Sequence, residues 1–512
     1  MKTFLSLPLL SVALSCASDV SAQAPVLSAQ FTDTARADKV ATTATAVSSL
    51  YESFYAKAGL PGLVYGIVLD DKLVYSGGFG YTDLAHKTPA DAHSLFRVAS
   101  MSKNFTAVAI LQLRDRGLLR LDDPVSLYVP EAANLVAPTA DSPPVTLRHL
   151  LTHGAGLPED NPWGDRQLAM SDDDLTALLR AGPSFSRAPD IHYEYSNLGF
   201  ALLGRVIENV SGLSFEQYTT RNILEPLGMR DTVWEVDKAD DKRMATGYDR
   251  ANGPLAAVTP EHHGAFGPMG GLITSVQDFA RFASLHLSAW PPRDGSDDGV
   301  LKRSSLREMH QPLRLNQFVA NGACPFVLGY SFGLTWAQEC DTPPYLSHNG
   351  GLPGFTGNWI FVPELGLAVM AFSNITYESL TPTNRTVVKQ IIRQAGLQPR
   401  ALPVPPLLDQ RHRQLTEYLF DWNQAESSGI FAGNFFRDLD VTTRNARGRK
   451  LRESMGEIRE TGPMQADNQL RGHFIVKGSK RDASVFFSMT PEPVPRIQAV
   501  ETTLLDAEAE RR

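Results

Sequence analysis

Strand-like sequence occurs near the beginning of this chain and again after residue 325. Between these two regions the apolar residues have helical spacing. Residues 62–69 and 72–81 are apolar runs on either side of Asp70-Asp71, which is the pattern of a β-hairpin. Further strand-like runs occur at 328–336, 358–362 and 366–373. This order predicts an α+β domain whose sheet draws strands from both of its ends.

Helical spacing of apolar residues characterises the middle of the chain. A serine followed by three aspartates begins one predicted helix, and a glycine closes another. The predicted helices are 100–116, 145–154, 171–181, 195–210 and 275–287, with one more at 386–394 after the last strand of the domain.

A proline-rich stretch at 398–410 is predicted to be a linker, and it follows a domain predicted at 23–397. Residues 411–507 are predicted to form a small α+β module. Its expected helices are 411–423, 429–436 and 441–460, and its expected strands are 470–477, 483–489 and 497–504. The module lacks a nucleophile motif and a cluster of metal ligands, so we expect it to have a structural role or to contribute to the rim of a substrate site.

The N-terminus has the pattern of a secretory signal peptide, predicted at 1–22. Lys2 precedes an apolar run that begins at residue 4, and Val20-Ser21-Ala22 suits cleavage before Gln23. The run is too short to cross a bilayer comfortably. We therefore expect an exported protein, periplasmic or secreted, without an integral membrane span; Cys16 lies in a sequence that fits a lipidation signal poorly.

Composition narrows the possible partners. The 512 residues are 43% hydrophobic and 20% charged, which is ordinary for a globular protein. The net charge is -8 and no long basic run occurs, so nucleic acid is not an expected partner. Cleavage of the signal peptide would leave Cys324 and Cys340, which can form one disulfide in an oxidising compartment but are not required to do so.

The predicted helix at 100–116 begins with a candidate catalytic pair. Ser100 and Lys103 are three residues apart and can therefore meet on one helix face. Apolar residues surround them, and an apolar environment lowers the pKa of a lysine. A neutral lysine is a base that can activate a serine hydroxyl. Taken alone, this motif is weak, because a surface helix can carry the same two residues.

Two further motifs strengthen the interpretation. Tyr195-Ser196-Asn197 places a tyrosine and an amide two residues apart, and Ser347-His348-Asn349-Gly350-Gly351 follows later. With these three motifs the chain resembles the serine β-lactamase and penicillin-binding-protein family, in its class C-like branch. That branch includes DD-peptidases, D-aminopeptidases and family VIII esterases. The resemblance implies an antiparallel sheet flanked by helices, with an all-helical subdomain.

The resemblance also implies catalytic roles. Ser100 would be the nucleophile, Lys103 its base, and Tyr195 a proton relay to the leaving group and later to the deacylating water. The backbone N–H groups of Ser100 and Gly351 would form the oxyanion hole.

Residues around this centre are expected to bind the substrate. Asn197 would hydrogen-bond to Lys103 or to the acyl amide, while His348 and Gly350 would line the strand side of the pocket. A lysine in place of His348 would supply a permanent charge for a penicillin-type carboxylate, whereas histidine is mostly neutral near pH 7. We therefore predict an esterase or peptidase. A β-lactamase or DD-peptidase is the alternative, and a penicillin-fold binding or scaffolding protein is a second.

Two other patterns are typical of different hydrolases, but their surroundings in the sequence do not support those functions. Residues 329–333 match Gly-x-Ser-x-Gly, but that motif needs a helix after its turn, and the sequence stays strand-like through Trp336. Ser331 is therefore not the expected nucleophile. His149 and His153 are interpreted as packing and turn residues, and no metal-ligand motif occurs, so we expect neither a metal nor another cofactor.

Overall fold

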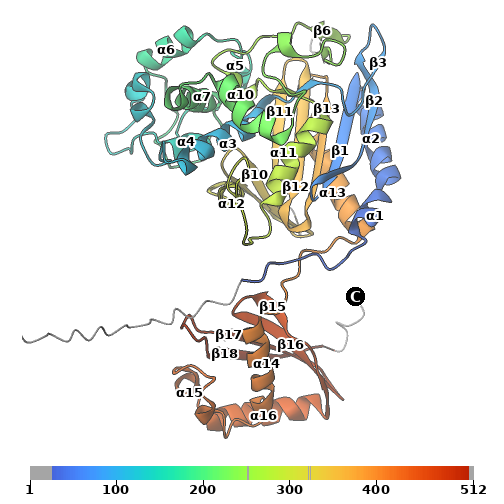
Figure 1. Ribbon diagram of the computed structural model, residues 1–512, viewed down its shortest axis with the longest axis vertical. Helices are drawn as coiled ribbons and strands as arrows, with labels where there is room; N and C mark the ends of the chain where they lie inside the picture. Colours follow the sequence, from blue (N-terminus) through green and yellow to red (C-terminus); the bar gives the residue numbers. More distant parts are fainter. Residues whose placement is uncertain (1–25, 251–252, 321, 323, 507–512) are drawn as a thin grey trace, which may run out of the picture. The chain divides into compact units, whose positions relative to one another are not determined.

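A nine-stranded sheet forms the centre of the larger of two units (Figure 1). The computed structural model describes residues 26–250, 253–320, 322 and 324–506. Residues 29–401 form one unit, and the described residues from 402 onward, with 26–28, form the other. The strand order is β3-β2-β1-β13-β12-β11-β10-β9-β8, and every neighbouring pair is antiparallel. The strands are β1 Gly62–Leu69, β2 Lys72–Asp83, β3 Thr88–Pro89, β8 Arg314–Val319, β9 Phe326–Tyr330, β10 Thr335–Glu339, β11 Thr342–Leu352, β12 Phe355–Val362 and β13 Leu367–Ser373.

The predicted fold class is confirmed, since β1 from the beginning of the unit pairs with β13 from its end. The predicted first hairpin is also present. Its turn places Asp70 in the left-handed region, at φ 57°, and aspartate is one of the few residues that tolerate this conformation.

The predicted strand at 328–336 is wrong in its extent. The chain reverses after Tyr330, and Gly333 adopts φ 69° in the turn that separates β9 from β10. A glycine accepts this conformation without a side-chain clash, and the periodicity of the apolar residues does not reveal such a turn. Ser331 lies in the turn, fully buried, and its Oγ donates to the Met309 carbonyl at 2.5 Å. Because a strand follows this turn, residues 329–333 do not form a nucleophile elbow.

Alternating side chains of β1 supply the cores on the two faces of the sheet. Leu63, Tyr65 and Ile67 belong to the core beneath α2 and α13, whereas Val64 and Val68 belong to the core shared with α3 and α11. A strand covered on both faces is apolar throughout, as the sequence of β1 shows. The covering helices are α1 Arg36–Ala41, α2 Ala44–Ala58 and α13 Thr381–Ala395 on one face, and α3 Ser102–Asp115 and α11 Val276–Ser288 on the other.

The middle of the unit is largely helical, as predicted. Side chains cap several of these helices: Ser171 Oγ accepts from Asp174 N, and Ser196 Oγ accepts from Gly199 N. The helices are α4 Leu147–Leu151, α5 Asn161–Gly164, α6 Asp172–Ala181, α7 Asn197–Ser211, α8 Phe215–Thr219, α9 Glu225–Leu227, α10 Gly267–Gly270 and α12 Arg303–Met309, with short strands β4 Phe96–Arg97, β5 Gly247–Asp249, β6 Ala256–Val258 and β7 Ile273–Thr274.

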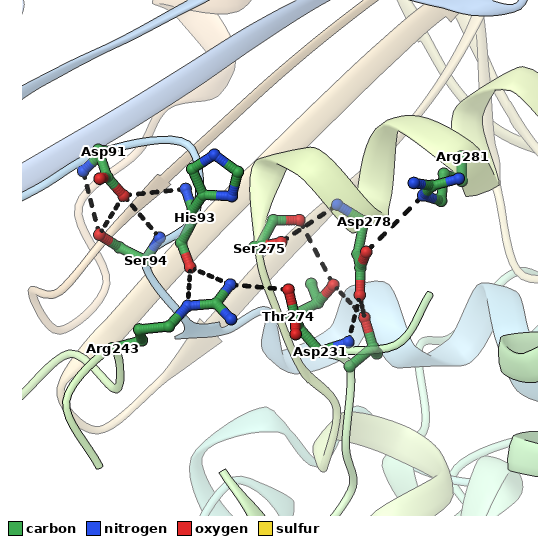
Figure 2. A network of polar contacts seen from close by, with 10 residues as sticks. Asp91, His93, Ser94, Asp231, Arg243, Thr274, Ser275, Asp278 and Arg281 are labelled. Carbon is green, nitrogen blue, oxygen red and sulfur yellow. Dashed lines mark hydrogen bonds and ion pairs between the residues drawn. The ribbon is translucent and has the colours of Figure 1, made fainter. Parts of the chain in front are cut away.

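A polar network ties three segments together beside the pair β4 and β7 (Figure 2). Arg243 donates to the His93 carbonyl at 2.7 Å and lies 2.8 Å from the carboxylate of Asp231. Asp278, in the first turn of α11, accepts from the N–H of Asp231 at 2.8 Å and from the hydroxyl of Thr232 at 2.9 Å. The network therefore fixes the chain on either side of β4 and β7, and β4 leads directly into the candidate site described below.

The second unit packs three helices with a five-stranded antiparallel sheet. Helix α14 begins at Pro406, inside the stretch predicted as linker, because proline fits the first turn of a helix. The helix predicted at 441–460 ends at Met455, and of the one predicted at 429–436 only Phe435 and Phe436 are helical, as the start of a short helix that ends at Asp438. The elements are α14 Pro406–Tyr418, α15 Phe435–Asp438, α16 Val441–Met455, β14 Ile458–Thr461, β15 Gln465–Asn468, β16 Arg471–Gly478, β17 Ala483–Met489 and β18 Ile497–Leu504.

Cys324 and Cys340 are joined as a disulfide, with Cα atoms 5.6 Å apart, next to the hairpin of β9 and β10. Among the described residues, no helix is long and apolar enough to span a bilayer. The predicted signal peptide at 1–22 lies outside the described part of the chain.

Candidate active site

Ser100 stands at a strained turn of the backbone between β4 and α3. It is the middle residue of a short 3-10 helix, Ala99–Met101, and the preceding Ala99 has φ 49°. For an alanine this left-handed conformation costs about 1–2 kcal/mol, and such strain is concentrated at functional sites. Ser100 is buried except for 8% of its surface and lines a cavity of about 570 Å³.

Lys103 is fully buried beneath Ser100, and three oxygen atoms surround its Nζ. These are Ser100 Oγ at 3.0 Å, Asn197 Oδ1 at 2.7 Å and the Met269 carbonyl at 2.9 Å. The amide and carbonyl oxygens can only accept hydrogen bonds. A neutral amine has two hydrogens and one lone pair, so donating to those two oxygens leaves the lone pair directed at the Ser100 hydroxyl.

The electrostatic environment favours this neutral form. Burial lowers the pKa of Lys103 to about 7 from 10.5, and the charges of Asp165 and Asp160 act in the opposite direction without cancelling the effect. Near neutral pH a large fraction of the lysine is therefore available as a base.

Tyr195 occupies the turn just before α7, where Ser196 caps the helix. Its ring centroid lies 4.9 Å from Lys103 Nζ, and it lines the same cavity as Ser100. Burial raises the pKa of Tyr195 well above 10, and the nearby Ser100 hydroxyl opposes that rise. The phenol thus carries its proton at neutral pH and can donate it, whereas Lys103 is the stronger candidate for the first proton acceptor.

His153 supports Tyr195 from behind. Its ring centroid is 4.2 Å from that of Tyr195, and its Nδ1 accepts from the N–H of Ser196 at 3.1 Å. Burial lowers the pKa of His153 well below 6.5, and the charges of Lys103 and His348 lower it further. These contacts agree with the predicted packing and turn role. The residue that His153 packs against, Tyr195, belongs to the candidate site. His149 caps its own helix, since its Nδ1 accepts from Thr146 N.

The beginning of α7 is held by a carboxylate that the sequence analysis did not identify. Asp160 accepts from the backbone N–H groups of Asn197 at 2.6 Å and Leu198 at 2.9 Å. The side-chain amide of Asn197 donates to Asn161 Oδ1 at 3.1 Å, so its oxygen is directed at Lys103. An anionic side chain is favourable at a helix N-terminus, and here it also orients Asn197.

The third motif lies where β11 extends past β10. The pairing of β11 with β10 reaches Ser347, whereas its pairing with β12 continues to Leu352. The edge thus left open passes beside the 3-10 helix of Ser100. A Cβ atom on Gly350 would lie 2.1 Å from the Val98 carbonyl oxygen, so only glycine permits this approach. Gly351 lines the same cavity as Ser100.

His348 lines the cavity as a neutral ring. Its Nδ1 lies 2.6 Å from the Asn349 carbonyl and its Nε2 lies 3.0 Å from the Tyr330 hydroxyl. The carbonyl requires a proton on Nδ1, so Nε2 accepts from Tyr330. Burial lowers the pKa of His348 to about 3, with a further decrease from the charge of Lys103. The third motif therefore contributes no positive charge near neutral pH.

Asp165 and Tyr377 also line the cavity, and sequence reasoning missed both. Tyr377 donates from its hydroxyl to Asp165 Oδ2 at 3.0 Å. Each residue lies in an irregular segment far from the three motifs, and neither has a periodic pattern or a neighbouring partner in the sequence. No feature of the sequence alone could have brought them together.

Comparison with known proteins agrees with the arrangement of these motifs. A family model described as "Beta-lactamase" matches residues 47–391. This chain belongs to the beta-lactamase family. It is 27% identical over 334 residues to "Protein flp" of Staphylococcus aureus (strain MW2), covering 65% of this chain and 63% of that protein. It is 28% identical over 329 residues to "Penicillin-binding protein 4*" of Bacillus subtilis (strain 168), covering 60% of this chain and 67% of that protein.

Solved structures of similar fold include three further proteins. An octameric penicillin-binding protein homologue from Pyrococcus abyssi aligns with a TM-score of 0.60 and 22% identity, over 90% of this chain and 96% of that one. A class C beta lactamase from Rhodobacter sphaeroides aligns with a TM-score of 0.53 and 22% identity, over 68% and 98%. A D-stereospecific amidohydrolase from Streptomyces sp. aligns with a TM-score of 0.51 and 22% identity, over 65% and 93%. At these identities the likeness concerns the fold.

No cluster of three or more His, Cys, Asp or Glu side chains suited to a metal ion occurs in the described part of this beta-lactamase family member. The geometry brings together a serine, a lysine and a tyrosine, with Asn197 and the glycines of β11 around them.

Proposed function

We propose that this chain is an exported serine hydrolase that cleaves an ester or amide bond through an acyl-enzyme on Ser100, as an esterase or peptidase. Membership of the beta-lactamase family supports a serine hydrolase in the broad sense. The observation that carries the proposal is the set of three oxygens around Lys103 Nζ, two of which can only accept hydrogen bonds.

Acylation follows from these contacts. Lys103 takes the proton of the Ser100 hydroxyl as Oγ attacks the substrate carbonyl carbon. The carbonyl oxygen becomes an oxyanion, which the backbone N–H groups of Ser100 and Gly351 stabilise. Tyr195 donates its proton to the leaving alcohol or amine, the bond to that group breaks, and the proton held by Lys103 restores the phenol.

Deacylation uses the same groups with water in place of the serine. Lys103 accepts the proton as water attacks the ester carbonyl of the acyl-enzyme, with Tyr195 as the relay: its phenol passes its own proton to the lysine and takes one from the water. The bond to Ser100 Oγ then breaks, Oγ recovers a proton, and the free acid leaves. After one turnover the enzyme has regained its initial protonation state. The product acid can then release its proton to the solvent.

The charge of the cavity favours an esterase or peptidase over an enzyme specialised for β-lactams. A β-lactam acid presents a carboxylate, which a cationic side chain would bind. Among the described residues lining the cavity, none is lysine or arginine, and His348 is neutral. Asp165 adds a negative charge to the same wall.

Labelling with a fluorophosphonate probe tests the nucleophile. We expect wild-type protein to be labelled at Ser100, and Ser100→Ala to lose both the label and the hydrolysis of p-nitrophenyl esters. Ser331→Ala is the matched control and should retain both, since Ser331 is buried and bonded to Met309. Labelling that persists in Ser100→Ala would refute the proposal, and absence of labelling and turnover in the wild type would favour a binding or scaffolding protein. Nitrocefin turnover faster than ester turnover would favour the β-lactamase alternative.

Export is tested separately. In a bacterial host, the full-length chain should yield a mature form beginning at Gln23 in the periplasm or medium, detected by mass spectrometry. A cytoplasmic protein that retains residues 1–22 would contradict the export part of the proposal.

A further inference from the structure

Asp165 is a carboxylate in the wall of the active-site cavity, and one of its two oxygens has no hydrogen-bond partner among the described residues. Asp165, which follows α5, is buried except for 5% of its surface and lines the cavity together with Ser100. Its Oδ2 accepts from the Tyr377 hydroxyl at 3.0 Å. Its Oδ1 is buried and makes no hydrogen bond within the described part of the chain. A buried carboxylate oxygen left in this way is costly unless a donor reaches it.

No fixed cation of the protein pairs with this carboxylate in the described structure. The charge of Lys103 lowers the pKa of Asp165, but that lysine is proposed to be neutral when it acts as the base. Arg97 borders a small adjoining cavity of about 20 Å³, but its guanidinium donates to the Glu261 carbonyl. Burial raises the pKa of Asp165 to about 6, so the group is still mostly ionised at neutral pH.

The walls around Asp165 suit a positively charged group. Tyr193, Tyr195, Tyr330 and Tyr377 all line the cavity, and tyrosine rings attract cations through their faces. A compact ammonium offers three donors and a charge, so it can pair with the carboxylate of Asp165, which lines the cavity, while it contacts a ring.

The position of Asp165 places its carboxylate beside the reacting centre. Tyr377, its hydrogen-bond partner, packs against Gly351: a Cβ atom there would lie 2.8 Å from the tyrosine ring. Asn161, four residues before Asp165, accepts from the side chain of Asn197, which contacts Lys103. The carboxylate thus belongs to the part of the cavity that lies next to the bound acyl group.

We propose that Asp165, positioned by Tyr377, is the subsite for a protonated amino group on the acyl part of the substrate. The preferred substrates would then be aminoacyl esters or amides and peptides with a free amino terminus. This inference rests on the proposed acyl-enzyme function of Ser100, and it adds a substrate class to that function.

Asp165 also raises the pKa of Lys103, so the test must separate substrate recognition from an effect on the base. An altered base changes the hydrolysis of all substrates in a similar way, whereas loss of an ammonium subsite affects only those with a charged amine. The informative quantity is therefore the ratio of kcat/KM for a free-amine substrate to kcat/KM for its N-acetylated counterpart.

The experiment uses the full-length enzyme with D- and L-alanine p-nitroanilide, the N-acetyl form of each, and p-nitrophenyl acetate. For wild type we expect the free amine to be preferred. In Asp165→Asn the ratio should fall by about 10- to 100-fold, the range for loss of a charged hydrogen bond. Glu159→Gln is the matched control, because Glu159 is an exposed carboxylate nearby that does not line the cavity, and its ratio should stay as in wild type.

Other results overturn one proposal or the other. If Ser100-dependent turnover occurs but wild type does not prefer the free amine, or the ratio is the same in Asp165→Asn, the subsite is refuted and the serine hydrolase stands. Cleavage of p-nitrophenyl acetate through Ser100 without any turnover of the anilides also refutes the subsite. If no substrate is cleaved and no fluorophosphonate reacts with Ser100, the proposed function itself fails.

Discussion

Replacing Lys103 with methionine is expected to lower kcat/KM for a p-nitrophenyl ester by about 10³- to 10⁴-fold, the upper range for loss of a positioned general base. Methionine fills a similar volume and suits a fully buried site, but it cannot take the proton of Ser100. Steady-state kinetics measures the effect, and circular dichroism verifies that the variant is folded.

The control for this substitution is Lys57→Met, which makes the same change at an exposed position on α2. It should leave kcat/KM within about twofold of wild type, as expected for a surface substitution away from the site. A Lys103→Met variant with nearly full activity would show that another group activates the serine.

Adding a methyl group to Gly350 should also remove most of the activity. In Gly350→Ala the new Cβ would overlap the Val98 carbonyl oxygen, so β11 must move away from the turn that carries Ser100. That movement displaces the backbone N–H of Gly351 relative to Ser100, and loss of one oxyanion donor costs about 10²- to 10³-fold in kcat. The decrease should appear in kcat, with a smaller change in KM.

Gly299→Ala is a suitable comparison, because the nearest atom to its new Cβ would be 3.9 Å away. It should retain wild-type kcat. If Gly350→Ala were equally active, the proposed approach of β11 to Ser100 would not be needed for catalysis.

The candidate catalytic residues could be predicted from the sequence where they are neighbours both along the chain and in space. Ser100 and Lys103 lie one helical turn apart, and Tyr195 and Asn197 lie on either side of a helix cap, so their local placement follows from helix geometry. The structure then brings these motifs together at hydrogen-bond distance. The order of strands likewise predicted a sheet built from both ends of the unit.

Long-range pairing was not predictable in the same way. Asp160 and Asp165 flank a four-residue helix, and Tyr377 lies in a loop after β13, so no periodicity marks them. Only the folded chain shows that Asp160 holds the start of α7 and that Tyr377 reaches Asp165. The strand β8 was missed because most of its residues are exposed, without an apolar alternation. Helix α16 was predicted too long because charged residues continue past Gly456, where the backbone turns at φ 77°.

The central claim is that neutral Lys103 activates Ser100, and the pH dependence of kcat/KM for neutral p-nitrophenyl acetate tests it most directly. Burial lowers the pKa of Lys103 to about 7, and protonation removes the base. Activity should therefore fall as pH decreases through about 7, approaching a tenfold loss per pH unit below it. An uncharged ester excludes effects from ionisation of the substrate. A midpoint near pH 7 is the predicted result; a midpoint near pH 10, where an ordinary lysine loses its proton, or constant activity down to pH 5 would contradict the account.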